Sequence, residues 1–91
     1  LNKKREEHFL ATQLKHDPIK DIKKSISLNE KIWFIKELFG GDIETYNNTL
    51  AKINQFDYLE QALDFLDKRF TWDYDNTTVK DFMEFVYRRF I

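Results

Sequence analysis

The sequence predicts an all-α fold, a compact bundle or orthogonal array of about five helices. Apolar residues recur at steps of three and four over most of the chain after residue 17. Two Gly and one Pro occur, and they stand at the ends of these periodic runs rather than inside them. A chain of 91 residues has room for one core. We therefore expect one helical domain over residues 18–91, preceded by a basic arm or weakly held helix over residues 1–17.

The first two predicted helices cover residues 18–24 and 28–39. Asp17 is a suitable N-cap for the first, and Pro18 is tolerated at its first position. Ser27 and Glu30 form a capping box for the second, which Gly40–Gly41 ends. At about 100° per residue, the second helix is predicted to turn one apolar stripe to the core. Its members are Leu28, Ile32, Ile35, Leu38 and Phe39.

Three further helices are predicted over residues 42–54, 58–70 and 78–90. Their expected caps are Asp42, Asp57 with Glu60 completing a capping box, and Thr77 or Thr78. Each helix carries an apolar stripe at helical spacing, and we expect these stripes to face the core. In order, they are Ile43, Tyr46, Leu50 and Ile53; Tyr58, Leu59, Ala62, Leu63, Leu66 and Phe70; and Val79, Phe82, Met83, Val86 and Phe90, with Phe85 and Tyr87 on either side of the last.

Composition narrows the possible compartments and partners. No Cys is present, which excludes disulfides and thiolate chemistry and favours a reducing, cytoplasmic setting, with the periplasm as the alternative. No apolar run approaches the roughly 18 residues of a membrane span. The chain begins with Leu1, so we expect it to be part of a longer protein.

Charge is divided between the two ends of the chain. Residues 1–36 carry a net charge of +4 and residues 37–91 a net charge of −5. This division predicts a protein partner or a weak homo-oligomer, in which the arm up to Lys24 meets the acidic Asp57–Asp67 face of another copy or of its own chain. The alternative is an accessory domain that binds nucleic acid, although the acidic remainder makes that less favourable. It would use Lys3, Lys4, Arg5, Lys15, Lys20, Lys23 and Lys24.

The pattern of polar residues does not predict an enzyme. His8 and His16 lie in the weakly held arm, where nothing would fix their geometry. Ser25 and Ser27 have no recognisable catalytic partners, and Gly40–Gly41 follows a helix rather than a strand. We therefore predict no catalytic residue and no cofactor.

One segment resembles a calcium-binding loop. Five polar residues occupy positions 1, 3, 5, 9 and 12 of such a loop: Asp73, Asp75, Thr77, Asp81 and Glu84. However, Thr78 stands where the loop needs Gly, and a helix cap at Thr77 or Thr78 would draw the later carboxylates away. We expect a capping loop that binds no metal. Glu60, Asp64 and Asp67 are similarly interpreted as a solvated helix face.

Aromatic residues make up 16% of the chain, more than a small core needs, and this surplus favours protein interaction. The candidate interaction residues are Trp33, Trp72, Tyr74, Arg88 and Arg89. Trp33 lies off the predicted inner stripe; burial in a central helix is the favoured interpretation, and contact with a partner is the other. Trp72 and Tyr74 either cover helix ends or are exposed. Arg88 and Arg89 could bind phosphate or carboxylate, but offsetting the helix dipole is the favoured interpretation.

Several segments together resemble a known family. They are the run Asp21–Asp42, the pairs Tyr46–Asn47 and Ile53–Asn54, Trp72, and the ending Phe85–Phe90. They resemble an uncharacterised helical domain found near the C-terminus of proteins from Bacteroidetes-type bacteria. The resemblance covers about residues 18–90 and implies a domain boundary but no activity. It also implies that the arm before Pro18 belongs to a variable preceding region.

Overall fold

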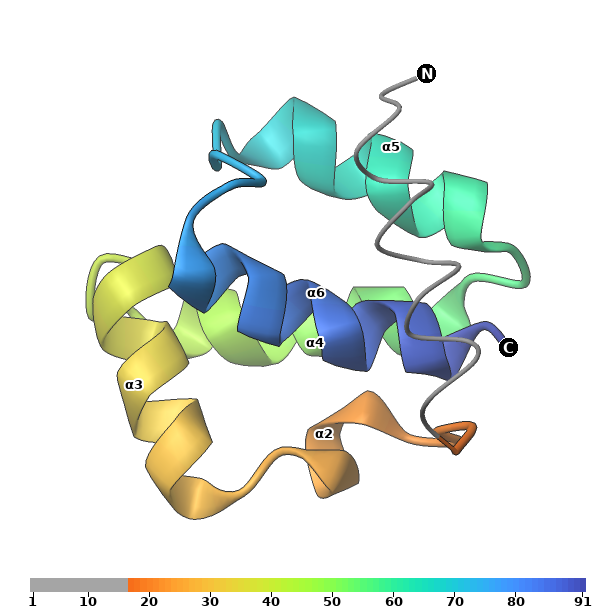
Figure 1. The fold of residues 1–91 in the computed structure, drawn as a ribbon, viewed down its shortest axis with the longest axis horizontal. Coiled ribbons are helices and arrows are strands. Elements are labelled where there is room, and N and C mark those ends of the chain that lie inside the picture. Colours follow the sequence, from red (N-terminus) through yellow and green to blue (C-terminus); the bar gives the residue numbers. More distant parts are fainter. Residues whose placement is uncertain (1–16) are drawn as a thin grey trace.

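A computed structural model describes residues 17–91, which form five helices and no strand (Figure 1). The helices are α2 (Ile22–Ser25), α3 (Leu28–Leu38), α4 (Ile43–Gln55), α5 (Leu59–Arg69) and α6 (Thr77–Arg89). The predicted all-α class is thereby confirmed. The predicted basic arm lies outside the described residues, apart from Asp17.

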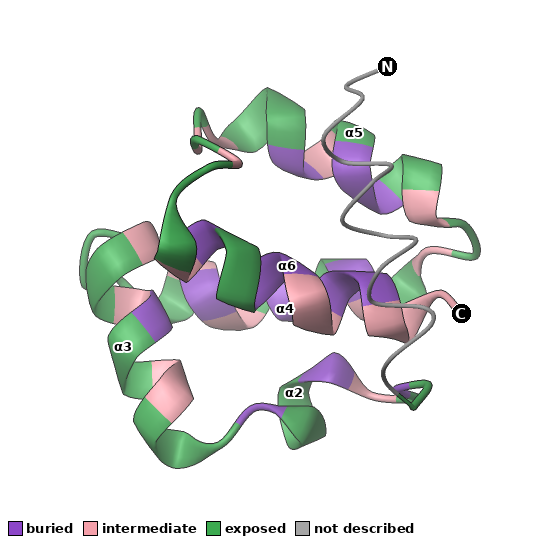
Figure 2. Ribbon diagram, in the orientation of Figure 1, coloured by how far each residue is buried: buried purple, intermediate pink, exposed green. Residues whose placement is uncertain are grey.

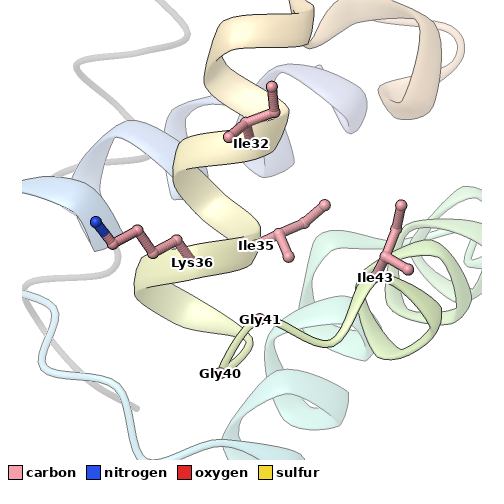
Figure 3. Close-up of a pocket in the computed structure, with 6 residues that line it drawn as sticks. All are labelled: Ile32, Ile35, Lys36, Gly40, Gly41 and Ile43. Atoms are coloured by element: carbon pink, nitrogen blue, oxygen red, sulfur yellow. The ribbon is translucent and has the colours of Figure 1, made fainter.

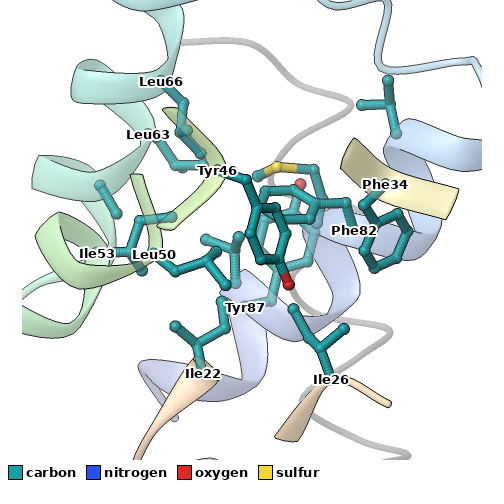
Figure 4. Close-up of a cluster of buried hydrophobic side chains, with 14 of the residues drawn as sticks. Ile22, Ile26, Phe34, Tyr46, Leu50, Ile53, Leu63, Leu66, Phe82 and Tyr87 are labelled. Atoms are coloured by element: carbon teal, nitrogen blue, oxygen red, sulfur yellow. The ribbon is translucent and has the colours of Figure 1, made fainter. Parts of the chain in front are cut away.

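Helix α6 is the centre of the arrangement. It packs against α2, α3 and α5, and α2 also packs against α4. In Figure 1, α5 lies above α6, α2 lies below it, and α3 crosses at one side. The buried parts of each helix are turned toward this centre (Figure 2). The core residues shown in Figure 4 include Phe34 of α3, Tyr46 of α4 and Phe82 of α6. The domain therefore has one core organised around its last helix.

Local capping chemistry sets the starts of α3 and α4 as predicted. The Ser27 hydroxyl accepts the Glu30 N–H at 3.2 Å, and the Glu30 carboxylate accepts the Ser27 N–H at 3.2 Å. The Asp42 carboxylate accepts the N–H groups of Glu44 and Thr45 at 3.0 and 3.3 Å. Between these helices, Gly40 and Gly41 have φ values of +61° and +82°, which side chains with a Cβ rarely adopt. This turn places the first residues of α4 beside the end of α3.

Helix α2 begins later than predicted. Its N-cap is Asp21, whose carboxylate accepts the Lys23 N–H at 3.0 Å, and residues 17–20 lie outside the helix. The N–H of buried Ile19 donates instead to the carbonyl of Arg88, at 2.8 Å. Extending a short helix by one turn stabilises it only slightly. The hydrogen bond from Ile19 to α6 is therefore favoured over the helix start predicted at Asp17–Pro18.

The caps of α5 and α6 also differ from the predictions. Tyr58, not Asp57, is the N-cap residue of α5, and Gln61 replaces Glu60 as the side chain that reaches back. The Gln61 side-chain oxygen accepts the N–H groups of residues 57 and 58, at 3.1 and 3.0 Å. At α6, Asn76 accepts the N–H groups of residues 78 and 79, at 2.9 and 3.1 Å, so neither threonine is the cap. At the start of both helices, one side-chain amide oxygen accepts hydrogen bonds from two backbone N–H groups that have no partner within the helix.

Most predicted core positions of α4, α5 and α6 are buried. They include Tyr46, Leu50, Ile53, Ala62, Leu63, Leu66, Val79, Phe82, Met83 and Val86. The predictions for Ile43 and Tyr58 are wrong, because these side chains are 52% and 70% exposed. Ile43 is the first residue of α4 and Tyr58 immediately precedes α5, so both stand where the chain enters a helix from the surface.

The predicted inner stripe of α3 is wrong for Leu28 and Ile32 but confirmed for Phe39, which is buried. Ile35 and Leu38 are partly buried against the core. Leu28 and Ile32 are 70% and 58% exposed, whereas Phe34 is 1% exposed. The Phe34 ring packs edge-on against Phe82 and Phe85 of α6, with centroids 5.3 and 6.1 Å apart. Helix α3 has apolar residues on two sides. The side with Phe34 faces the aromatic core, which Phe39 joins from the C-cap position. The other side remains on the surface.

Candidate interaction surface

Four apolar residues gather where the outer side of α3 meets the start of α4. Leu28, Ile32 and Ile35 follow one another on α3 at steps of four and three, which places them on one line along the helix. Ile43 approaches this line from α4. We call these four residues the outer apolar surface. Three of them are more than half exposed, and Ile35 is partly buried.

A shallow depression of about 350 Å³ lies in the part of this surface nearest the turn between α3 and α4. It is lined by Ile32, Ile35, Lys36, Gly40, Gly41 and Ile43. In Figure 3, the Ile35 side chain extends toward Ile43, and the Lys36 side chain extends to the other side of α3. A Cβ added at either glycine would meet no atom within 4 Å, so the turn leaves this side of the depression open. The walls are therefore apolar and accessible.

Positive charge borders the outer apolar surface along α3. Lys36 follows Ile32 by four positions and Lys31 precedes Ile35 by four, so each lies about 40° from the apolar line. Lys36 is exposed and Lys31 is half-buried. The acidic residues of α3, Glu30 and Glu37, lie on the opposite side of the helix. Both long edges of the α3 stripe thus carry a lysine.

Trp33 is half exposed, at 49%, so the interpretation that it is buried in a central helix is wrong. Phe34, the next residue, takes the interior position instead. The Trp33 indole N–H donates to the Thr78 hydroxyl at 3.3 Å, and the Lys36 ammonium lies 6.0 Å from the ring centroid. Trp33 is therefore an exposed aromatic residue beside the outer apolar surface but not part of it.

The loop between α5 and α6 folds back over the core. The Trp72 ring stacks on Phe70, with a centroid distance of 4.4 Å and an interplanar angle of 10°. Its indole N–H donates to the carbonyl of Leu38 at 3.1 Å. The Tyr74 hydroxyl donates to the Asp67 carboxylate at 2.6 Å. Of the two alternatives for this loop, the structure therefore has the one in which it covers helix ends.

The two C-terminal arginines fasten distant segments to α6. Arg88 donates through Nε to the carbonyl of Asp17 at 3.0 Å. Arg89 donates through Nε to the side-chain oxygen of Asn54 at 3.2 Å and through Nη2 to the Asn54 carbonyl at 2.9 Å. The Asn54 amide in turn donates to the Asp21 carboxylate at 2.8 Å. These guanidinium groups hold the fold together at the last turn of α6.

The five predicted interaction residues do not form one patch. Trp33 contacts Thr78 in the first turn of α6, whereas Arg88 and Arg89 lie in its last turn. The outer apolar surface contains none of the five. Lys20, Lys23 and Lys24 are exposed near α2, but the other four residues of the predicted basic footprint lie outside the described part of the chain. Nucleic-acid binding stays a prediction.

Three side chains in the described part have clearly shifted pKa values, and each has a structural cause. The hydrogen bond from Asn54 lowers the pKa of Asp21, and the hydroxyl and N–H of Thr45 lower that of Asp42. Burial raises the pKa of Tyr46 to about 12, with a further contribution from the negative charge of Glu30. The two aspartates cap helices and the tyrosine belongs to the core, so these shifts reflect the fold.

The segment that resembles a calcium loop forms a turn before α6. The Asp73 carboxylate accepts the N–H of Asp75 at 2.9 Å, while Asp81 and Glu84 belong to the helix that Asn76 caps. Over residues 17–91, no group of three or more His, Cys, Asp or Glu side chains is placed to hold a metal ion. His8 and His16 lie outside this range. The absence of calcium binding stays a prediction.

Comparison with known families places most of the chain in one of them. Residues 23–91 match the family described as a domain of unknown function, DUF8457. The chain belongs to this family. The match contains α3 to α6 and the whole outer apolar surface. Searches of the curated proteins and of the solved structures found no significant match. Among the described helices, none has the length and apolar character needed to cross a membrane.

Proposed function

We propose that this chain is a non-catalytic protein-interaction module of a larger cytoplasmic bacterial protein. The resemblance noted in the sequence supports a bacterial origin and a position near the C-terminus of that protein. The observation that carries the proposal is the outer apolar surface, where three large aliphatic side chains are more than half exposed. Two of them, Ile32 and Ile43, line one depression, and Leu28 continues the surface along α3. Contiguous exposed apolar residues of this kind mark binding sites for other proteins.

The chemistry of the depression favours binding over catalysis. Its one ionisable lining residue is Lys36, whose ammonium group lies near the exposed Trp33 ring. A catalytic cleft normally brings a perturbed acid or base together with further polar groups. Here the shifted groups are Asp21, Asp42 and Tyr46, which serve as caps or core, and none of them lines the depression.

Position-specific photo-crosslinking in cells that make the full-length protein would test this proposal. A photoreactive amino acid is placed at position 32, in the outer apolar surface, and at position 68 as a control on the exposed side of α5. We expect a defined crosslinked protein, identified by mass spectrometry, from position 32 and not from position 68. The same crosslink should weaken when Ile43→Ser is introduced, because Ile43 forms the opposite wall. Equal crosslinking from both positions, unaffected by Ile43→Ser, would contradict the proposal.

A further inference from the structure

The outer apolar surface has a shape and a charge pattern that specify its occupant. We infer that it binds an amphipathic α-helix of a different protein, in which Asp or Glu residues border the apolar stripe. This inference rests on the proposed interaction function and adds the chemistry of the partner. It follows from the spacing of the apolar residues, from the lysines beside them, and from what two copies of the surface would do if they met.

The spacing of the apolar residues favours a helical partner. Leu28, Ile32 and Ile35 repeat at steps of four and three, the pattern by which one helix packs along another. Ile43 stands beside this line and makes a groove of what would otherwise be a ridge. Helix α3 has 11 residues and is therefore about 16 Å long. A partner helix of about three turns would cover it.

The lysines beside the stripe favour acidic flanks on that helix. Lys31 and Lys36 border the two long edges of the stripe, while Glu30 and Glu37 are turned away from it. Asp42 and Glu44 stand on either side of Ile43. The Asp42 carboxylate is turned onto the first turn of α4, where it accepts two N–H groups, and Glu44 lies about 100° around that helix from Ile43. A helix that carries carboxylates on both sides of its apolar residues would therefore meet opposite charges along α3.

The same lysines disfavour a second copy of this chain. In a two-fold antiparallel pairing of α3 with α3, Ile32 of one copy would lie opposite Ile35 of the other. The two-fold axis also faces each long edge of the stripe with the same edge of the other copy, so Lys36 lies beside Lys36 on one edge and Lys31 beside Lys31 on the other. Like charges facing each other oppose association. The surface is thus better matched to a different, acidic helix than to itself.

Two synthetic peptides can test the inference against the purified 91-residue chain. Both are capped, fluorescein-labelled 14-residue peptides with Leu at positions 2, 6, 9 and 13; one has Glu and the other Lys at the flanking positions. Binding is measured by fluorescence anisotropy at low salt. We expect the Glu-flanked peptide to bind about tenfold more tightly than the Lys-flanked one, because two charge contacts change sign.

Charge reversal on the protein provides the sharper comparison. Lys31→Glu/Lys36→Glu should reverse the preference between the two peptides. Lys20→Glu/Lys68→Glu changes the net charge equally at exposed positions away from the surface and should preserve the preference. Ile32→Ser should weaken both peptides, and circular dichroism checks that each variant is folded.

Each other outcome overturns part or all of the proposal. If both peptides bind equally and Ile32→Ser weakens both, the interaction surface stands and the inferred acidic partner is wrong. If neither peptide binds while crosslinking from position 32 succeeds, the partner is not an amphipathic helix. If sedimentation shows that the chain dimerises and that Ile32→Ser abolishes the dimer, the occupant is a second copy. Failure of both the peptides and the crosslink refutes the surface itself.

Discussion

Both apolar sides of α3 carry large hydrophobic residues, but one side is buried and the other is exposed. The inner side places Phe34 against Phe82 and Phe85 and joins Phe39 to the aromatic core. The outer side leaves Leu28 and Ile32 in solvent. Helical periodicity is stronger on the outer side, which has three residues at steps of four and three, than on the inner side, where Phe34 and Leu38 make a single step of four. Periodicity alone therefore does not identify the side that packs on α6. The comparison shows that a helix with two apolar sides can bury one side in the core of the domain while the other side remains exposed and available for binding.

The largest expected loss of stability comes from a substitution on the inner side of α3. Phe34→Ala should lower the free energy of unfolding by about 3–5 kcal/mol, the range for large aromatic truncations in a core. The cause is the loss of its packing on α6 together with the cavity that remains. Urea denaturation followed by far-ultraviolet circular dichroism measures the change. A loss below about 1 kcal/mol would mean that α3 does not turn this side inward.

A substitution in the turn between α3 and α4 should have the next largest effect. Gly40 has φ of +61°, and an L-residue there is strained even though a Cβ would meet no neighbour. Gly40→Ala should therefore lower the free energy of unfolding by about 1–2 kcal/mol. The same denaturation experiment measures it. Lys68→Ala, on an exposed helix face, is the control and should have almost no effect.

Trp33 lies between the two sides and should be intermediate in effect. It is half exposed and has one hydrogen bond, to Thr78. Trp33→Ala should lower the free energy of unfolding by about 1 kcal/mol, a typical value for a single substitution and well below that of Phe34→Ala. Trp33→Phe retains most of the ring but not the N–H, so it separates packing from the hydrogen bond. Equal losses for Trp33→Ala and Phe34→Ala would contradict the assigned orientation.

The outer side should contribute least to the stability of the isolated chain. Ile32→Ser should change the free energy of unfolding by no more than about 0.5 kcal/mol, as is usual for exposed positions. Ile53→Ser, at a fully buried position of α4, is the matched control and should be strongly destabilising. A large loss for Ile32→Ser would show that the outer apolar surface belongs to the core.

Acid should weaken the start of α4, which holds Ile43 beside α3. Hydrogen bonds from Thr45 lower the pKa of Asp42 in the folded state. The stabilisation by this carboxylate is therefore present above the unfolded pKa and is lost as the pH falls below about 4, through the folded pKa. Asp42→Asn should show a smaller loss of stability than the wild type between pH 5 and pH 2. Identical slopes for the two proteins would contradict the assigned bonds.

Local chemistry made most of the helices predictable. The capping box at Ser27 and Glu30, the Asp42 cap and the Gly40–Gly41 turn depend on residues close in sequence, and the structure has all of them. The start of α2 was not predictable in this way. The Asp17–Pro18 pattern is a sound local indication, but the contact of Ile19 with Arg88 overrides it, and that contact joins residues 69 positions apart.

The candidate surface was harder to predict because it depends on which side of α3 is turned inward. That choice is made by Phe82 and Phe85, which lie far along the sequence. The surplus of apolar residues on this helix is visible in the sequence, but the predicted inner stripe contains Leu28 and Ile32 and leaves Trp33 as the residue in excess. A second stripe, formed by Phe34 and Leu38 at a step of four, was the available indication. Large aromatic residues on one stripe favour that stripe for the core.

The attachment of residues 17–22 to the end of α6 has a consequence for the order in which the domain is completed. Asp17 and Ile19 are held by Arg88, and Asp21 and Ile22 by Asn54, which Arg89 holds in turn. During synthesis the ribosome releases these early residues long before it adds the two arginines. Ile22 and Ile26 can meet α4 earlier, but the cover that α6 provides is complete only when the last turn of that helix has emerged. A nascent chain that stalls a few codons short of Arg88 would present them to chaperones and proteases.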